Sequence, residues 1–182
     1  DATSNKRTTL GSVESGVAFL WSPDGSTLAL ARSRISVGGI YDTIEFFRAD
    51  GTSVGSVIED ILIAFYWSPD SSKLAYVTLT NQAAVFRWQV LDMEDGSVQF
   101  VTEFKPSGPQ ITLFQFFDQF SYSHQVWSPG SDALVFAGRP VGGVISEVSD
   151  LFSGSQIIVA SLDQTPSIRP IASGEMGFWS PR

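Results

Sequence analysis

The chain has 182 residues, of which 43% are hydrophobic and 16% are charged, a balance typical of one globular domain with a sizeable core. Eleven basic residues stand against nineteen acidic ones, so the formal charge of −8 would repel a phosphate backbone, and we expect no nucleic-acid partner. The absence of cysteine excludes disulfides, thiolate metal sites and cysteine nucleophiles. The longest apolar run, 61–67, is far shorter than the roughly 18 to 20 residues that a membrane-spanning helix needs, and we expect no membrane insertion.

The chain begins at Asp1, without a methionine or a signal segment, so we expect a processed product or a piece of a longer protein. The first predicted element is a strand over 7–13. The first full unit then predicts strands over 16–21, 27–32, 43–48 and 52–58, with an Asp-Gly hairpin signal before the last.

The turn between the first two strands of this unit reads Trp21-Ser-Pro23-Asp24-Gly25. Proline fixes φ and has no N–H for a ladder, so Pro23 ends the strand, while Asp24 can bond its own backbone and Gly25 accepts a positive φ. Trp21 is the last strand residue before the corner. We therefore expect this tryptophan to pack against a neighbouring sheet in a structural role.

The motif Trp-Ser-Pro, which begins at Trp21, recurs at Trp67, Trp127 and Trp179, so that successive copies are separated by 46, 60 and 52 residues. The second unit predicts strands over 61–67, 73–78, 85–91 and 98–104. The third unit predicts strands over 119–127, 133–137, 156–161 and 167–172, and a further strand follows at 175–179.

Four antiparallel strands per repeat, with almost no helical periodicity, form the unit of a β-propeller blade. We therefore predict an all-β fold, a single partial propeller domain over 1–182. Its blades, each a four-stranded antiparallel meander, are predicted at 15–59, 61–105 and 114–173, with strands of incomplete flanking blades at 7–13 and 174–182. Closed propellers have about four to eight blades, so we expect either a longer parent protein or self-association of copies that closes the ring.

The turn followed by an apolar strand and an Asp-Gly hairpin resembles the repeat of the TolB-like propellers of bacteria, which is also found in the propellers of prolyl-oligopeptidase-type peptidases. The repeat positions are Trp21, Pro23, Asp24, Trp67, Pro69, Asp70, Trp127, Pro129 and Trp179. The third copy departs from the pattern because Gly130 stands where aspartate is expected. The resemblance implies a binding platform, usually on the periplasmic or extracellular side.

Binding residues are expected on the long insertions at 33–42, 105–118 and 139–155, because all three are predicted on the face opposite the tryptophan turns. The second insertion leads into five aromatic residues between Phe114 and Tyr122 and the only histidine. One interpretation is that these aromatic residues fill the blade interface and that the histidine makes a core hydrogen bond. The other is a binding surface made of Phe116, Phe117, Asp118, Tyr122, His124, Leu151 and Phe152.

We expect no catalysis, metal or cofactor within this chain. The segment 51–55 matches the G-x-S-x-G pattern of hydrolases, but it follows a hairpin and enters a strand instead of a helix. One histidine without cysteine makes a poor zinc site, and 92–96 lacks the ligand spacing of a calcium loop. The remaining hypotheses are a non-catalytic module that binds a protein or peptide, and the gating propeller of a serine peptidase whose catalytic domain lies outside the chain.

Overall fold

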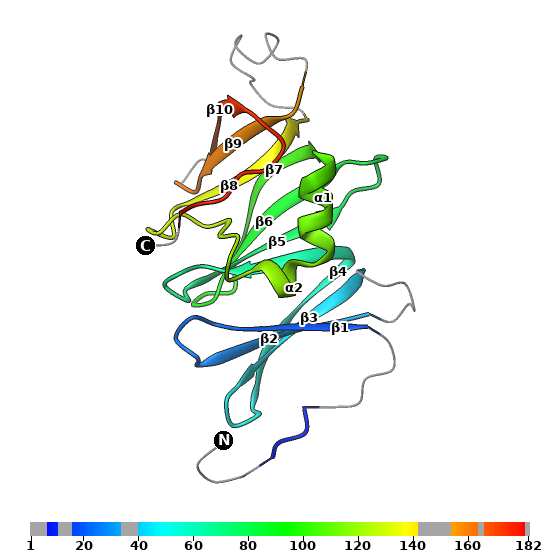
Figure 1. The fold of residues 1–182 in the computed structure, drawn as a ribbon. Coiled ribbons are helices and arrows are strands. Elements are labelled where there is room, and N and C mark those ends of the chain that lie inside the picture. The colour runs from blue at the N-terminus through cyan, green and yellow to red at the C-terminus, as the bar shows by residue number, and fades with distance from the viewer. Residues whose placement is uncertain (1–6, 11–15, 34–39, 142–153, 164–165, 181–182) are drawn as a thin grey trace.

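A computed structural model of the chain describes residues 7–10, 16–33, 40–141, 154–163 and 166–180 (Figure 1). Its elements are β1 (Val17–Trp21), β2 (Thr27–Arg32), β3 (Tyr41–Arg48), β4 (Ser53–Trp67), β5 (Lys73–Leu79), β6 (Phe86–Asp92), β7 (Val98–Pro106), α1 (Gly108–Gln115), α2 (Phe117–Phe120), β8 (Ala133–Pro140), β9 (Gln156–Ser161) and β10 (Ser167–Ser173). The ten strands pair antiparallel in chain order, from β1 to β10. The all-β prediction is therefore confirmed.

The first two meanders share one strand. The sequence predicts separate strands over 52–58 and 61–67, but β4 runs through both without a turn. Its first part, up to Ile58, pairs mainly with β3, and its second part, from Leu62, pairs with β5. The prediction of two strands is wrong because the residues between them, Glu59 and Asp60, carry no turn signal such as glycine or proline.

The third meander lacks the inner strand predicted over 119–127. Helix α1 precedes this segment and α2 overlaps its start, and within the segment only Gln125 and Trp127 form isolated bridges. Helix α1 begins because the Ser107 hydroxyl accepts a hydrogen bond from the Gln110 amide (3.1 Å), with a proline in its first turn. The alternating aromatic pattern misled the prediction, since Phe114 lies in α1 and Phe117 in α2, and both are buried.

Helix α1 takes over the hydrogen bonds that the missing inner strand would have made to β8. The backbone N–H of Ala137 donates to the Gln110 side-chain oxygen (2.9 Å), and the Ala137 carbonyl accepts from the Ser107 amide (3.2 Å). Further along β8, Gly138 lies so close to the carbonyl of Lys105 in β7 that an added Cβ would collide with it. The edge of β8 is thus satisfied by a helix and by β7.

The described parts of the flanking strands predicted at both ends, 7–10 and 174–180, do not form the predicted strands. Residues 7–10 have no strand structure, and 11–13 lie outside the described residues. At the other end, the strand pairing of the segment 175–179 is limited, within the described residues, to the isolated bridge between Trp179 and Gln125. This segment lies against the outer face of the third meander, where Gly177 contacts Val135 and Ile157.

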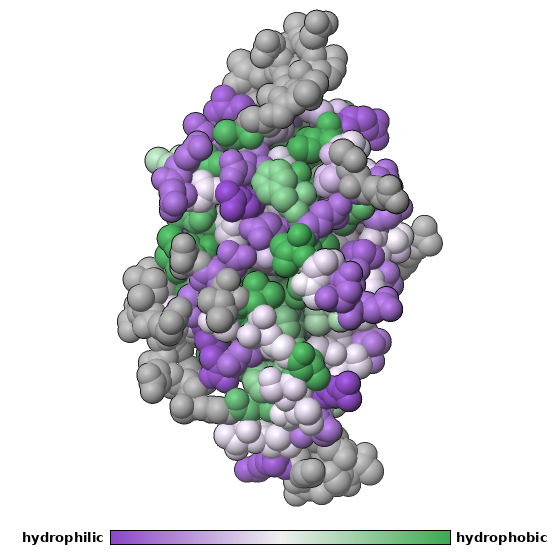
Figure 2. Space-filling model, turned by 180° about the vertical axis from the view of Figure 1, so that it is seen from behind, coloured by the Kyte–Doolittle hydropathy of each residue, from purple (hydrophilic) through white to green (hydrophobic). Residues whose placement is uncertain are grey.

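The core joins the second and third meanders through a cluster of aromatic rings in tilted and edge-on contact. Phe104 and Phe136 lie 4.6 Å apart between ring centroids, and Trp88 meets Phe114 edge-on at 5.6 Å. Helix α1 lies across the sheet (Figure 1), and its Phe114 contacts the rings of Phe86 and Trp88 on β6 and of Phe104 on β7. On the opposite side of the molecule, apolar residues (green) lie mainly along the middle, between polar residues (purple) at both margins (Figure 2).

The tryptophan turns are built around a buried serine. In the first turn the Ser22 hydroxyl donates to Asp24 Oδ1 (2.6 Å) and accepts from the Thr27 amide (3.0 Å). The second turn repeats this pattern at Ser68 and Asp70. In the third turn, Ser128 donates instead to Asp132 (2.6 Å), two residues beyond Gly130. A displaced carboxylate therefore replaces the aspartate that the third copy lacks.

The same turns link one meander to the next through two hydrogen bonds. The Trp67 indole N–H donates to the Leu20 carbonyl (3.1 Å), and the Trp127 indole N–H donates to the Tyr66 carbonyl (3.0 Å). In addition, the amide of Asp24 donates to the Ser71 hydroxyl (3.1 Å), as that of Asp70 does to Ser131. Trp67 and Trp127 thus each bond the residue just before the tryptophan of the preceding turn.

Candidate binding site

The insertion after β7 crosses the molecule from the loop end of the strands to the tryptophan turns. Near its middle, Asp118 lies close to Tyr41, at the start of β3. Burial of the phenol raises the pKa of Tyr41, and the charge of the Asp118 carboxylate raises it further. Further along, Tyr122 reaches Trp21 and Pro23 in the first tryptophan turn. Tyr122, which follows the predicted insertion 105–118, therefore lies on the side of the tryptophan turns.

A shallow pocket of about 40 Å³ lies where the insertion meets the tryptophan turns. It is lined by Leu20, Trp21, Pro23, Tyr66, Trp67, Ser121, Tyr122, Gln125, Val126 and Trp127. Pockets that enclose small-molecule ligands are roughly 300 to 1,000 Å³ in volume, so this one has room only for the tip of a side chain. The arrangement suits contact with a protein or peptide surface.

The predicted binding residues separate into exposed and buried groups. Phe116 and Tyr122 are 45% and 66% exposed, and Asp118 is also exposed. Phe117, by contrast, is 1% exposed and packs against Tyr41, Phe65 and Tyr66, with 4.7 Å between the ring centroids of Phe117 and Phe65. Its predicted place on a binding surface is therefore wrong.

Leu151 and Phe152, the two apolar residues predicted from the third insertion, lie outside the described residues.

His124 makes contacts of a structural kind. Its Nδ1 lies 2.8 Å from the Ser123 hydroxyl, and its ring meets Phe120 and Phe178 edge-on at 5.2 and 4.8 Å. A serine and histidine pair that acts in acyl transfer needs a third group that orients the imidazole. Within the described part of the chain, no carboxylate contacts this ring, and no cluster of three metal-ligating side chains occurs.

Sequence reasoning missed the exposure of the first tryptophan. Trp67 and Trp127 are buried, at 7% and 1% exposure, but Trp21 is 39% exposed, and Phe19 on the same face of β1 is 57% exposed. The repeat position is the same in all three, so the motif itself carries no signal for this difference. The difference lies in the contacts, since the indoles of Trp67 and Trp127 donate to the carbonyls of Leu20 and Tyr66.

Several further observations bear on the class of protein. None of the helices in the described part is long and apolar enough to cross a membrane. No protein-family model matches the chain, and no curated protein matches it. Solved structures do match.

A eukaryotic initiation factor superposes with a TM-score of 0.59 and 14% identity, over 94% of this chain and 37% of that one. The β-propeller domain of the trilobed protease from Pyrococcus furiosus, which has an open velcro topology, gives a TM-score of 0.52 and 14% identity, over 85% of this chain and 43% of that one. TolB from Acinetobacter baumannii matches at 17% identity and a TM-score of 0.43, over 87% of this chain and 31% of that one. The chain spans less than half the length of each of these structures. With its consecutive antiparallel meanders, it has a β-propeller fold.

Proposed function

We propose that the chain is a non-catalytic, TolB-like β-propeller module that binds a protein or peptide. The binding surface is the turn surface, defined here as Trp21, Pro23 and Tyr122 around the shallow pocket. Phe116, exposed on the insertion before α2, extends the contact area of the module. The proposal rests on the fold and on the chemistry of this surface.

The observation that carries the proposal is the exposure of large aromatic side chains around a pocket too small for a small molecule. Tyr122 is 66% exposed although it lies beside a well-packed core. Tryptophan and tyrosine are enriched among the residues that contribute most to protein–protein affinity, because they offer a large rigid apolar body and a polar edge. Because the hydrogen-bonded turns already hold these aromatic side chains in place, binding would require little loss of loop conformational entropy.

A selection of displayed random dodecapeptides on the immobilised chain tests the proposal. Peptides that bind the wild-type chain should lose binding to Tyr122→Ser, a change at an exposed position that leaves the fold intact. The matched control is Ile171→Ser, which removes an apolar side chain that is 50% exposed from β10. Peptides that bind the folded Tyr122→Ser variant as well as the control variant would overturn the turn surface as the site.

The second candidate function is the gating propeller of a prolyl-oligopeptidase-type serine peptidase. The observation that favours it is the similarity in fold to the propeller domain of the trilobed protease. A parent reading frame that encodes an α/β-hydrolase segment with serine, aspartate and histidine would decide for this role. A parent reading frame without such a segment would remove it.

Self-association is a further part of the proposal. Apolar side chains are exposed at both ends of the row of meanders, with Phe19 on β1 at 57%, and Met176 and Phe178 at the other end at 42% and 47%. Head-to-tail contact between copies would bury both surfaces. Light scattering during size exclusion should then give a mass above that of one chain, and Phe19→Ser should lower it. A monomer at high concentration would contradict this part.

A further inference from the structure

A groove of about 420 Å³, larger than the turn pocket, lies between the first and second meanders. It is lined by Phe46, Val54, Gly55, Ser56, Val57, Glu59, Tyr76, Gln89, Leu91, Asp92, Met93, Gly96 and Val98. The groove exists because β4 belongs to both meanders. Its first part pairs with β3 and its second part with β5, so the strands of the two meanders diverge on either side of it. Its volume lies in the range of ligand-binding clefts.

Apolar side chains project from both rims of this groove. The register between β3 and β4 shifts around Val54, and this bulged residue is 44% exposed. On the opposite rim, Val98 is 48% exposed and Phe100 is 55% exposed. Val98 pairs with Leu91 and Phe100 with Gln89, and both partners line the groove, so these side chains face the same side of the sheet.

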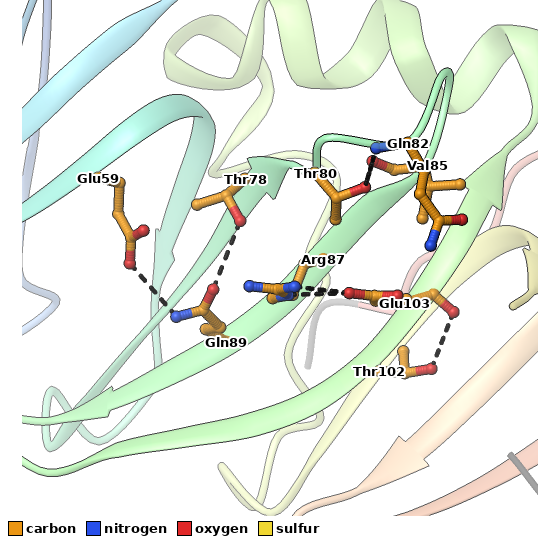
Figure 3. Close-up of polar contacts among 9 residues, drawn as sticks. All are labelled: Glu59, Thr78, Thr80, Gln82, Val85, Arg87, Gln89, Thr102 and Glu103. Atoms are coloured by element: carbon orange, nitrogen blue, oxygen red, sulfur yellow. Dashed lines mark hydrogen bonds and ion pairs between the residues drawn. The ribbon is translucent and has the colours of Figure 1, made fainter. Parts of the chain in front are cut away.

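A hydrogen-bonded carboxylate lies between the rims. Glu59 Oε1 accepts from the Tyr76 hydroxyl (3.1 Å) and from the Gln89 amide nitrogen (3.3 Å), and that amide nitrogen also lies 2.8 Å from the Tyr76 oxygen. Burial, followed by the charge of Glu59, raises the pKa of Tyr76, so the phenol keeps the proton that it donates. Thr78 donates to the other end of the Gln89 amide and fixes its orientation (Figure 3).

This carboxylate has no cationic partner among the described residues. Arg87, drawn in Figure 3, is engaged by Glu103, with N–O distances of 2.7 and 3.1 Å. Oε2 of Glu59 accepts no hydrogen bond within the described part of the chain. The described lining of the groove contains two carboxylates, Glu59 and Asp92, and no lysine or arginine. The groove is therefore complementary to a cation carried on an apolar ligand.

We propose that the groove binds an extended peptide segment in which an arginine or lysine is flanked by apolar residues. The cation pairs with Glu59, and the flanking side chains pack on Val54, Val98 and Phe100. A peptide suits the groove better than a small cation does, because the apolar rims extend on both sides of the carboxylate. The outer edge of β7 over 98–101 pairs with no other strand in the described part, so its backbone groups are open to an added strand.

The test is an array of immobilised heptapeptides with arginine, lysine, glutamine or glutamate at the centre and valine, leucine or tyrosine on either side, probed with the labelled chain. The wild-type chain should bind the arginine and lysine peptides about tenfold more tightly than the glutamine peptides, as expected for one charge-assisted hydrogen-bonded pair. Glu59→Gln should abolish this preference. Glu94→Gln, a matched change in the nearby hairpin outside the groove lining, should keep it and so exclude attraction by net charge alone.

A second variant keeps the proposal testable if Glu59→Gln fails to fold. Val54→Lys places a cation on the rim and should weaken binding of the arginine peptides, whereas Ile171→Lys, the same kind of change at an exposed site on β10, should not. The proposal is overturned if no peptide binds, if arginine and glutamine peptides bind equally, or if the folded Glu59→Gln and Val54→Lys variants keep the wild-type preference. A preference lost with Tyr122→Ser instead would place basic-peptide binding at the turn surface.

Discussion

The four tryptophans of the repeated phrase should contribute very differently to stability, and Trp127→Phe should be among the most damaging single changes. Trp127 is 1% exposed, and its indole N–H bonds the Tyr66 carbonyl at 3.0 Å. Losing this hydrogen bond costs about 1 kcal/mol, and the space left by the smaller ring costs about 1 to 2 kcal/mol more. The free energy of unfolding should therefore fall by about 2 to 3 kcal/mol.

The other tryptophans provide internal controls for this prediction. Trp67→Phe breaks the equivalent bond to Leu20 and should cost a similar amount. Trp21→Phe acts at a 39% exposed side chain whose indole N–H has no acceptor in the described part, and it should cost less than about 1 kcal/mol. At Trp179 the indole nitrogen is buried with no hydrogen-bond partner among the described residues, so Trp179→Phe removes an unsatisfied donor and should also be mild.

Urea unfolding followed by far-ultraviolet circular dichroism measures these free energies without relying on tryptophan fluorescence, which the substitutions themselves alter. The expected order of destabilisation is Trp127→Phe and Trp67→Phe well above Trp21→Phe and Trp179→Phe. Equal losses at all four positions, or a loss for Trp127→Phe within about 0.5 kcal/mol of that for Trp21→Phe, would refute the role assigned to the indole hydrogen bonds.

Three further changes test other parts of the fold. Burial alone would raise the pKa of Asp70, but hydrogen bonds from the neighbouring serine hydroxyls and a backbone amide lower it to about 2. The stability from this carboxylate is present above the ordinary pKa of about 4 and is lost as the pH falls through 2. Asp70→Asn should therefore flatten the dependence of the free energy of unfolding on pH in that window, and parallel curves for the variant and the wild-type chain would count against this. Gln110→Ala leaves the backbone N–H of Ala137 without its acceptor and should lower the free energy of unfolding by about 1 to 3 kcal/mol, whereas exposed Gln115→Ala in the same helix should have little effect. Asp132→Ala removes the displaced carboxylate of the third turn and should destabilise by about 1 kcal/mol in urea unfolding; no change would show that Gly130 needs no substitute.

The strands of the fold were predictable wherever turn chemistry separated them. The predicted bounds 27–32 and 156–161 agree with β2 and β9, because a turn signal lies at one end of each strand and apolar residues recur in both. The failures occur where one pattern satisfies two structures. Aromatic residues between Phe114 and Tyr122 alternate as in a strand, yet the cap at Ser107 begins a helix, and Phe114 lies in α1 and Phe117 in α2.

The candidate sites were less predictable because they depend on contacts between distant segments. No local pattern relates Tyr122 to Trp21, which lies about a hundred residues earlier in the chain, although both line one pocket. The burial of Phe117 likewise follows from its neighbours on β3 and β4, not from its own sequence context. The groove at Glu59 depends on the shared strand β4, which the turn signals did not predict.

The most direct test of the account is hydrogen exchange at the indole N–H groups, measured by nuclear magnetic resonance on the folded chain. The repeated tryptophans are expected to join each meander to the one before it through an indole hydrogen bond, while the exposed Trp21 is expected to contact a binding partner. The account predicts slow exchange for Trp67 and Trp127, whose indole N–H groups bond buried carbonyls, and fast exchange for Trp21. Exchange at Trp67 and Trp127 as fast as at Trp21 would contradict it.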